Sequence, residues 1–255
     1  MRFDVVTLFP ELFTPLLITG ITRRAYDTGL VDVKFRNPRD FASGNYRRVD
    51  DRPFGGGPGM VMMAEPLAKC LADIHSERQE DVPVVLFSPV GKALNHAMVM
   101  RLADSQGAVL ICGRYEGIDQ RFVDMYVTEQ ISLGDFVLSG GEIAAMALLD
   151  AVARLQPGVL GDADSHAQDS FNPALDGLLD CPHYTRPDHW EGRAVPEVLL
   201  SGHHIQIERW RRDQRLLLSS HLRPELIEQA RAADRLSKAD EGLLARYNGG
   251  LIDPL

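Results

Sequence analysis

The segment ISLGDFVLSGGEIAAMALLDAVARL (residues 131–155) changes character twice along its length. It opens with apolar residues typical of a strand, passes through a turn rich in glycine, and continues as a helix that is apolar around most of its circumference. A plain strand does not need these glycines, and a plain loop does not need so many apolar side chains. We therefore interpret residues 131–142 as a wall of backbone bent around a flat ligand.

The same alternation of strands and helices extends over roughly the first 155 residues. Segments rich in Val, Ile, Leu and Phe, typical of strands buried on both faces, are 3–9, 31–37, 82–89, 108–115 and the start of 131–142. Helical spacing of apolar residues occurs in 64–77, 96–106 and 141–155. This order predicts an α/β fold with a mostly parallel sheet. The helix 141–155 is either a core helix or one face of a dimer interface.

The composition changes after Arg154. Residues 156–177 are rich in Gly, Pro, Asp, Ser and Asn and show no periodicity, which is typical of a linker that is mobile when no ligand is bound. Helical patterns follow at 204–222 and 224–236, and Ser237 with Asp240 forms a capping-box pattern before a last helix. We expect a domain at 1–160, a flexible linker at 161–175 and a small helical domain at 176–255.

Composition also restricts the class of protein. The chain has 255 residues, 45% hydrophobic and 25% charged, as in an ordinary soluble globular protein. Charged residues and Pro10 interrupt the apolar residues of 1–13, which excludes a secretory signal there, and the longest apolar run, 143–149, is too short to cross a bilayer. Three scattered cysteines without Cys-x-x-Cys spacing fit a reducing cytoplasm. We expect a cytoplasmic protein without membrane contact.

The net charge of −9 by itself disfavours a nucleic-acid partner. A phosphate, however, interacts electrostatically only with charges within a Debye length of about 8 Å at physiological salt, so local clusters of basic residues matter more than the net charge. Two such clusters exist: Arg47, Arg48 and Arg52 in the first half, and Arg209, Arg211, Arg212 and Arg215 in the second. On charge alone, each cluster could equally be a solvated face with interspersed acids.

Four segments at predicted strand ends or near the basic residues carry glycine or proline: 54–60, 87–92, 112–119 and 131–142. Ligands of parallel α/β sheets bind beyond the carboxyl ends of the strands, where such loops lie. The Walker A, Rossmann and nucleophile-elbow motifs are absent from the sequence. These absences favour a ligand without a polyphosphate, held by backbone hydrogen bonds from bent loops.

Six strings carry a family resemblance: RRVDDRPFGGGPGMVM (47–62), GRYEGID (113–119), LGDFVLSGGE (133–142), PGVLG (157–161), DSF (169–171) and LLDCPHYTRP (178–187). In this order they resemble the bacterial tRNA (guanine-N1-)-methyltransferases, members of the SPOUT class of S-adenosylmethionine-dependent enzymes. The resemblance spans essentially the whole chain. It departs at Ala144, where the family pattern has proline, a change at the rim of the expected pocket.

The resemblance implies a trefoil knot in the N-terminal domain, an unusual fold feature because knotted chains are rare. It also implies a homodimer whose active site lies between subunits, and S-adenosylmethionine bound in the knot loops. By the same match, the residues that bind this cofactor are Pro89, Gly113, Glu116, Leu133, Gly134, Asp135, Phe136, Val137, Leu138, Gly140 and Gly141. Adenine would lie against the backbone of 133–138 and of Gly113, and Glu116 would lie near the methionine part.

The implied reaction methylates N1 of guanosine 37, beside the tRNA anticodon. Because this N1 carries a proton at neutral pH, the reaction needs a general base and a group that stabilises negative charge on O6. We expect Asp169 to be the base and Arg154 to be the stabilising group. A turn acid and a helix C-terminal charge are the alternative interpretations of these two residues. The two arginine clusters would hold the tRNA backbone, and the family also implies Mg²⁺ at a site that the sequence does not identify.

Two other functions fit parts of the sequence. Another SPOUT methyltransferase could act on a different RNA nucleoside, although a ribose methyltransferase would have no use for a base at guanine N1. A non-catalytic RNA-binding protein could retain the pocket without the reaction.

Overall fold

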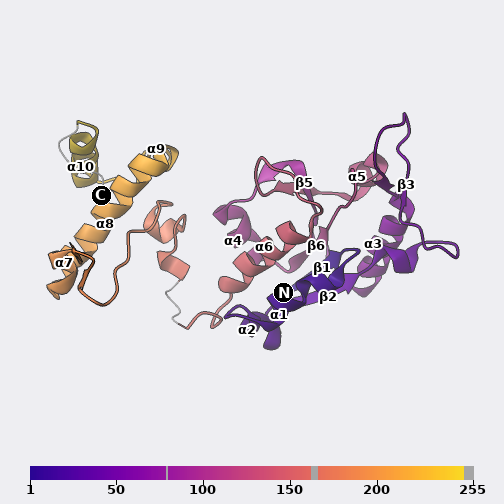
Figure 1. Cartoon of the computed structure of the whole chain (residues 1–255), viewed down its shortest axis with the longest axis horizontal. Coiled ribbons are helices and arrows are strands. Elements are labelled where there is room, and N and C mark those ends of the chain that lie inside the picture. Colours follow the sequence, from indigo (N-terminus) through magenta and orange to yellow (C-terminus); the bar gives the residue numbers. More distant parts are fainter. Residues whose placement is uncertain (79, 162–165, 250–255) are drawn as a thin grey trace. The chain divides into compact units, whose positions relative to one another are not determined.

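The protein is described by a computed structural model over residues 1–78, 80–161 and 166–249 (Figure 1). Its contacts divide the chain into two compact units, residues 1–161 and 162–255, which are described separately below. Among the described residues, no helix combines the length and the apolar character that a bilayer crossing requires.

Unit 1 is built on a five-stranded sheet in the order β2-β1-β6-β5-β7. Its strands are β1 (Arg2–Val6), β2 (Asp32–Arg36), β5 (Val84–Ala93), β6 (Gly107–Ile111) and β7 (Glu129–Ser132). Every neighbouring pair is parallel. The predicted α/β class with a mostly parallel sheet is therefore confirmed.

Helices cover both faces of this sheet (Figure 1). One core cluster joins the sheet to α1 (Thr14–Ile18), α2 (Arg23–Asp27), α4 (His96–Ala103) and α6 (Glu142–Arg154). The other joins it to α3 (Ala64–Glu77) and α5 (Gln120–Tyr126). On α6, residues such as Ala145, Leu148 and Leu149 are buried, whereas Ile143 is 50% exposed. The helix is therefore a core helix that also presents an apolar side chain at the surface.

The segment 87–92 differs from the prediction that it follows a strand. It lies inside β5, where Phe87 and Lys92 both pair with Ile131 of β7 and the residues between them bulge away from the ladder. Gly91 closes the bulge, because a Cβ there would lie 2.5 Å from the backbone nitrogen of Ile131. A strand-like sequence pattern cannot show this excursion, since the bulge depends on its partner strand.

The strand β7 is likewise shorter than the apolar pattern of 131–138 indicates. It ends at Ser132, whose carbonyl accepts a hydrogen bond from the backbone of Leu94 (2.8 Å). Gly134 follows with φ +153°, a conformation that few other residues adopt. The apolar residues after it belong to a loop, so they are not explained by a sheet.

A small antiparallel hairpin, β3 (Asp50–Asp51) with β4 (Val61–Met62), lies beside the sheet. Its base is joined to the loop after β6, because Met62 donates its backbone N–H to the carbonyl of Gly117 (2.9 Å) and Glu116 donates to Met60 (3.0 Å). The hairpin therefore shares a rigid attachment with that loop.

Unit 2 is mainly helical. It contains α7 (Glu197–Leu200), α8 (His204–Leu222), α9 (Pro224–Ala232) and α10 (Lys238–Asn248), with a short hairpin of β8 (His189–Trp190) and β9 (Arg193–Ala194). Buried leucines of α8, α9 and α10 form its core together with Leu178. The capping box of Ser237 and Asp240 is present at the start of α10, as the sequence predicts.

The predicted linker 161–175 lies partly outside the described residues, at 162–165. Its described part carries two short 3₁₀ helices, His166–Gln168 and Pro173–Leu175. Phe171 donates its backbone N–H to the carbonyl of Leu178 (2.8 Å), and Leu175 is buried. The end of this segment is thus folded as part of unit 2.

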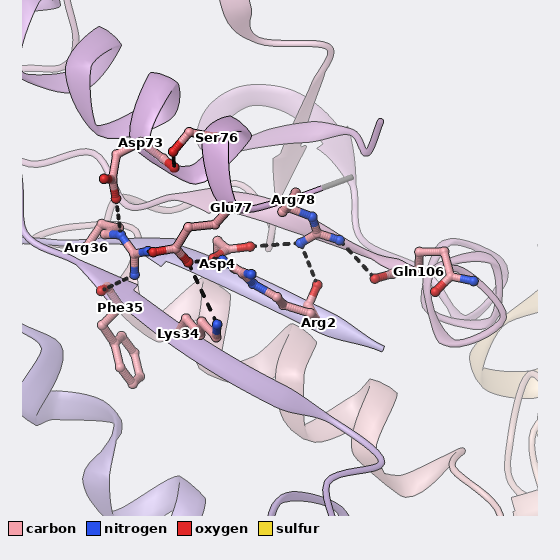
Figure 2. Close-up of polar contacts among 10 residues, drawn as sticks. All are labelled: Arg2, Asp4, Lys34, Phe35, Arg36, Asp73, Ser76, Glu77, Arg78 and Gln106. Carbon is pink, nitrogen blue, oxygen red and sulfur yellow. Dashed lines mark hydrogen bonds and ion pairs between the residues drawn. The ribbon is translucent and has the colours of Figure 1, made fainter. Parts of the chain in front are cut away.

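A buried ion pair lies between the first strand and the end of α3 (Figure 2). Asp4 of β1 has no exposed side-chain surface and receives Arg78 Nη1 at 2.8 Å and Arg2 Nη2 at 2.6 Å. Arg78, which follows α3, also donates to the carbonyls of Arg2 and Gln106. Glu77 extends the network toward the surface, where Arg36 lowers the pKa of its carboxyl. These contacts fix the end of α3 to the first strand.

We predict that Asp4→Ala destabilises the protein by about 3–5 kcal/mol, because it leaves the buried Arg78 guanidinium without its carboxylate. The matched control is Arg101→Ala, which removes a well-formed but half-exposed pair with Glu129 and is expected to cost about 1 kcal/mol or less. Urea unfolding of both variants measures the difference. Equal losses of stability would show that burial of the Asp4–Arg78 pair does not increase its contribution to the free energy of unfolding.

Candidate functional site

A cavity of about 460 Å³ lies where the bulge of β5 meets the loops that follow β6 and β7. The bulge contributes Ser88 to Val90, the loop after β6 contributes residues 113–118, and the loop after β7 contributes residues 136–141. These loops meet because parallel strands direct their carboxyl ends to the same edge of the sheet. A cavity of this size suits a small-molecule ligand.

The wall formed by 131–142 is apolar and partly open to solvent. Ile131 and Leu133 line its inner part, whereas Phe136 is 56% and Val137 is 85% exposed. The turn is shaped locally, since Ser132 Oγ donates to the carbonyl of Gly134 and accepts from its N–H, both at 3.1 Å. The segment is therefore a bent wall of a cavity, as its composition indicates.

Two loops of the cavity are held against each other by their backbones. Gly141 donates its N–H to the carbonyl of Gly113 (3.0 Å), and Arg114 forms an antiparallel bridge with Gly140. A Cβ at Gly141 would lie 2.8 Å from Cα of Cys112, and one at Gly140 would lie 2.3 Å from Arg114 Nε. At these two positions glycine is required for contact between chain segments.

A buried carboxylate strengthens this junction. Glu142, 1% exposed at the start of α6, accepts hydrogen bonds from Thr7 Oγ1 (2.8 Å) and Arg114 Nε (3.1 Å). The guanidinium of Arg114 also lies 4.6 Å from the ring centre of Phe9 and donates to the carbonyl of Ser139. Burial raises the pKa of the adjacent Cys112 thiol, which therefore stays protonated.

Sequence reasoning did not identify Thr7, Arg114 and Glu142 as parts of the site. Arg114 and Glu142 lie within the strings that carry the family resemblance, but their pairing crosses between two loops and leaves no spacing signal. Thr7 lies at the end of β1, more than a hundred positions from its partner.

The structure brings most of the predicted cofactor residues together. Those that line the cavity are Pro89, Gly113, Glu116, Leu133, Phe136, Val137, Leu138, Gly140 and Gly141. Gly134 and Asp135 do not line it; they form the turn between its inner and outer parts. The divergent Ala144 lies at the cavity and is 4% exposed.

Glu116 is an exposed carboxylate at the cavity, next to the β3–β4 hairpin. Gly59 makes room for it, because a Cβ at Gly59 would lie 2.4 Å from Glu116 Oε1. The side chain is therefore held between the cavity and the hairpin.

The two predicted catalytic residues lie in different units. Arg154 is the last residue of α6, whereas Gly141 and Ala144 at the other end of this helix line the cavity. Twelve residues of helix place the backbone of Arg154 about 18 Å from that of Glu142. Asp169 is half-buried in a turn of unit 2, where it accepts a backbone hydrogen bond from Asn172 and donates one to His166.

The first arginine cluster is exposed. Arg47 pairs with Asp40 (3.3 Å) and Arg48 with Asp51 (3.4 Å), and both pairs are more than half exposed. Arg52 is also exposed. Such pairs contribute little stability and can exchange one anionic partner for another.

The second cluster is largely committed to pairs within unit 2. Arg209 and Arg212 both contact Asp240, Arg211 contacts Glu208, and Arg215 contacts Asp180. Burial opposes ionisation of Asp240, but hydrogen bonds from Ser237 and Arg212 lower its pKa below the ordinary value. A solvated face is wrong for Arg215, because this residue of α8 is buried at 9% exposure.

One group of three side chains in the described ranges has metal-binding atoms within 4.8 Å of one another: Asp180, Cys181 and His183. Magnesium prefers oxygen ligands, and this group offers one carboxylate already bound to Arg215. Burial raises the pKa of Cys181, which disfavours the thiolate that other metals need. The donor set does not fit Mg²⁺.

Comparisons with known proteins identify a family that matches this chain. A model of the family described as tRNA (Guanine-1)-methyltransferase TrmD matches residues 1–229. A protein of Albidiferax ferrireducens named tRNA (guanine-N(1)-)-methyltransferase is 79% identical over 96% of this chain and 99% of its own length. Proteins with the same name from Paracidovorax citrulli and Bordetella pertussis are 70% and 57% identical, each over 98% of this chain and at least 98% of their own lengths.

We predict that Gly141→Ala and Gly113→Ala differ in their effects on stability, although both residues line the cavity. Gly141→Ala forces backbone against backbone and is expected to cost about 1–3 kcal/mol. At Gly113 a Cβ would lie 3.5 Å from Ile118, an ordinary contact, so the change is expected to stay within about 0.5 kcal/mol. Chemical denaturation measures both. A stable Gly141→Ala protein would contradict the close junction of the loops.

Proposed function

This chain belongs to the tRNA (guanine-1)-methyltransferase family, and we propose that it transfers a methyl group from S-adenosylmethionine to N1 of guanosine 37 in tRNA. The observation that carries this proposal is the cavity bounded by the 131–142 wall and the loop 113–118. The same residues carry the strings by which the sequence resembles the family.

The cavity fits the proposed donor in size and chemistry. Its volume of about 460 Å³ and its apolar wall suit an adenine ring held between Leu133, Phe136 and Leu138. Gly113 lines the cavity without a side chain, which supports close approach of a ligand to its backbone. When bound, S-adenosylmethionine supplies an electrophilic methyl group on a sulfonium. Pro89, Glu116, Gly134, Asp135, Val137, Gly140 and Gly141 would shape or hold the remainder of the site.

The protein's own task is to prepare the guanine. Asp169 takes the proton from N1, so that the lone pair on this nitrogen becomes available. The negative charge that moves onto O6 is stabilised by the guanidinium of Arg154. We propose that Asp169, which lies in unit 2, is placed at the guanine only when tRNA is bound, which couples proton removal to the correct substrate.

The position of Arg154 supports an active site shared by two copies of the chain. Within one copy, the length of α6 separates Arg154 from the cavity. A second copy can supply an arginine to the cavity of the first, so we propose a homodimer with the active site between subunits. The trefoil knot in unit 1 belongs to the same proposal.

Arginines of both clusters are proposed to hold tRNA phosphates, in a cytoplasmic enzyme whose three cysteines are free and buried. The exposed Arg47, Arg48 and Arg52 are the better placed for this role. In unit 2, Arg209 and Arg211 retain partial exposure, whereas Arg215 holds Asp180. The family also implies Mg²⁺, but the described side chains do not fit a magnesium site, and no step is assigned to it.

The substrate is tested by transfer of a labelled methyl group to an unmodified tRNA transcript with guanosine at position 37. A second transcript that differs only at this position is the matched control. We expect labelling of the first alone, and digestion of the product should release 1-methylguanosine. Equal labelling of both transcripts, or a ribose-methylated product, would reject the proposed substrate.

The roles of the two catalytic residues are tested by single-turnover methylation with the tRNA bound. Asp169→Asn is nearly isosteric and is expected to lower the rate constant by about 10²–10⁴-fold, because an amide cannot take the N1 proton. Arg154→Ala is expected to lower the rate by about 10²–10³-fold through loss of charge stabilisation at O6. A near wild-type rate for Asp169→Asn would refute the base. An unchanged rate with weaker tRNA binding would make Arg154 a phosphate contact instead.

A further inference from the structure

Two aromatic side chains of unit 1 are almost fully exposed. Phe54 is 98% and Tyr46 is 89% exposed, and they exceed every other large apolar side chain in the described ranges. Both lie in residues 43–60, which we call the arm. The arm surrounds β3 and extends outward from the sheet (Figure 1). A phenyl ring left in water keeps its apolar surface available for burial against a partner.

The backbone of the arm holds these rings away from the protein. Gly55, Gly56 and Gly57, directly after Phe54, all have positive φ, and a Cβ at any of them would meet open space. Gly44 and Arg47 give the turn beside Tyr46 the same left-handed conformation. The two turns are therefore shaped by backbone conformation and not by packing, and the rings project from them.

The charged side chains between the two rings are mostly basic, and their ion pairs are weak. Arg47, Arg48 and Arg52 lie between Tyr46 and Phe54, accompanied by Asp50 and Asp51. The pairs of Arg47 with Asp40 and of Arg48 with Asp51 are both about 60% exposed, so their arginines can turn to an external anion at little cost. Aromatic rings on either side of arginines provide the chemistry that binds unpaired nucleotides, with stacking for the bases and cations for the phosphates.

The base of the arm borders the candidate active site. Met60 accepts the backbone N–H of Glu116, and Gly59 lies against the Glu116 side chain, which lines the cavity. The arm therefore begins beside the cavity that is proposed to hold the methyl donor. A second protein copy is less suited to this surface, because the rings are separated by charges and form no continuous apolar patch.

We infer that the arm is an RNA clamp, in which Phe54 and Tyr46 stack on unpaired bases next to the target guanosine while Arg47, Arg48 and Arg52 contact the adjoining phosphates. The inference rests on the proposed function. It adds two positioning residues and a defined contact, the single-stranded anticodon loop, to that function.

The test compares Phe54→Leu and Tyr46→Leu with Phe54→Trp and Tyr46→Phe in binding to the unmodified tRNA transcript. Each leucine variant is expected to raise Kd about 5- to 150-fold, the loss of one stacked base, whereas the tryptophan and phenylalanine variants keep wild-type affinity. Thermal unfolding and S-adenosylmethionine binding measured by calorimetry should be unchanged in all four, because the replaced rings contact solvent.

Salt dependence separates stacking from charge. Phe54→Leu is expected to leave the slope of log Kd against log salt unchanged, whereas Arg48→Gln reduces its magnitude by about 0.7–0.9, the value for one phosphate. In a transcript with 2-aminopurine beside position 37, binding should quench fluorescence through stacking, and Phe54→Leu or Tyr46→Leu should lose part of this quenching.

Wild-type affinity of both leucine variants would overturn the clamp while wild-type methylation of the transcript left the proposed function standing. Weakened binding that Phe54→Trp and Tyr46→Phe fail to restore would also overturn it, since stacking tolerates these exchanges. A dimer that dissociates in sedimentation when Phe54 becomes leucine would assign the arm to a subunit contact instead. Failure of the wild-type protein to bind tRNA would defeat the proposed function, independently of the arm.

Discussion

The close approach of two backbone segments, Gly140–Gly141 and Cys112–Arg114, is the constraint on which the cavity depends. Each of these glycines leaves room that a methyl group would fill, and the N–H of Gly141 bonds directly to the carbonyl of Gly113. Glu142 then holds Arg114 from a position with almost no solvent contact. Because a buried carboxylate is tolerated only with such partners, the ion pair and the backbone contact reinforce each other. Together they hold the loop after β6 against the loop that leads into α6.

This junction places functional groups from distant parts of the sequence around one space. The bulge of β5 closes the cavity from a third side, and Gly91 permits it by letting the chain return against Ile131. The loop after β6 also supports the β3–β4 hairpin through the bonds of Glu116 and Met62. Movement of the loop after β6 would therefore displace both the 131–142 wall and the arm. In the same unit, the Asp4–Arg78 pair fixes the end of α3 to β1.

The sequence predicts most of the elements but little of what joins them. The ranges 64–77 and 204–222 match α3 and α8 in full, because the apolar periodicity is continuous there. The wall at 131–142 is recognisable in the sequence from its glycines. The sequence does not show that its strand ends at Ser132, nor that β5 contains a bulge, since both features depend on pairing with partner strands. The burial of Arg215 was also missed, because the number of charges in RWRRDQR does not reveal that Arg215 forms an ion pair with Asp180. Pairing across the chain, as in Arg114 with Glu142, leaves no local pattern at all.

The charge distribution explains how an acidic chain can serve an RNA substrate. Of the two arginine clusters, the one in unit 2 is largely neutralised by Asp176, Asp180 and Asp240, so its charge mainly stabilises that unit. The cluster at 47–52 carries looser pairs on an exposed segment, and a net charge of −9 does not cancel it at the short range over which phosphate acts. The cations available to an anionic partner are thus distinguished by exposure and not by number. Since α6 separates Arg154 from the cavity of its own copy, the proposed role of Arg154 depends on the proposed second chain.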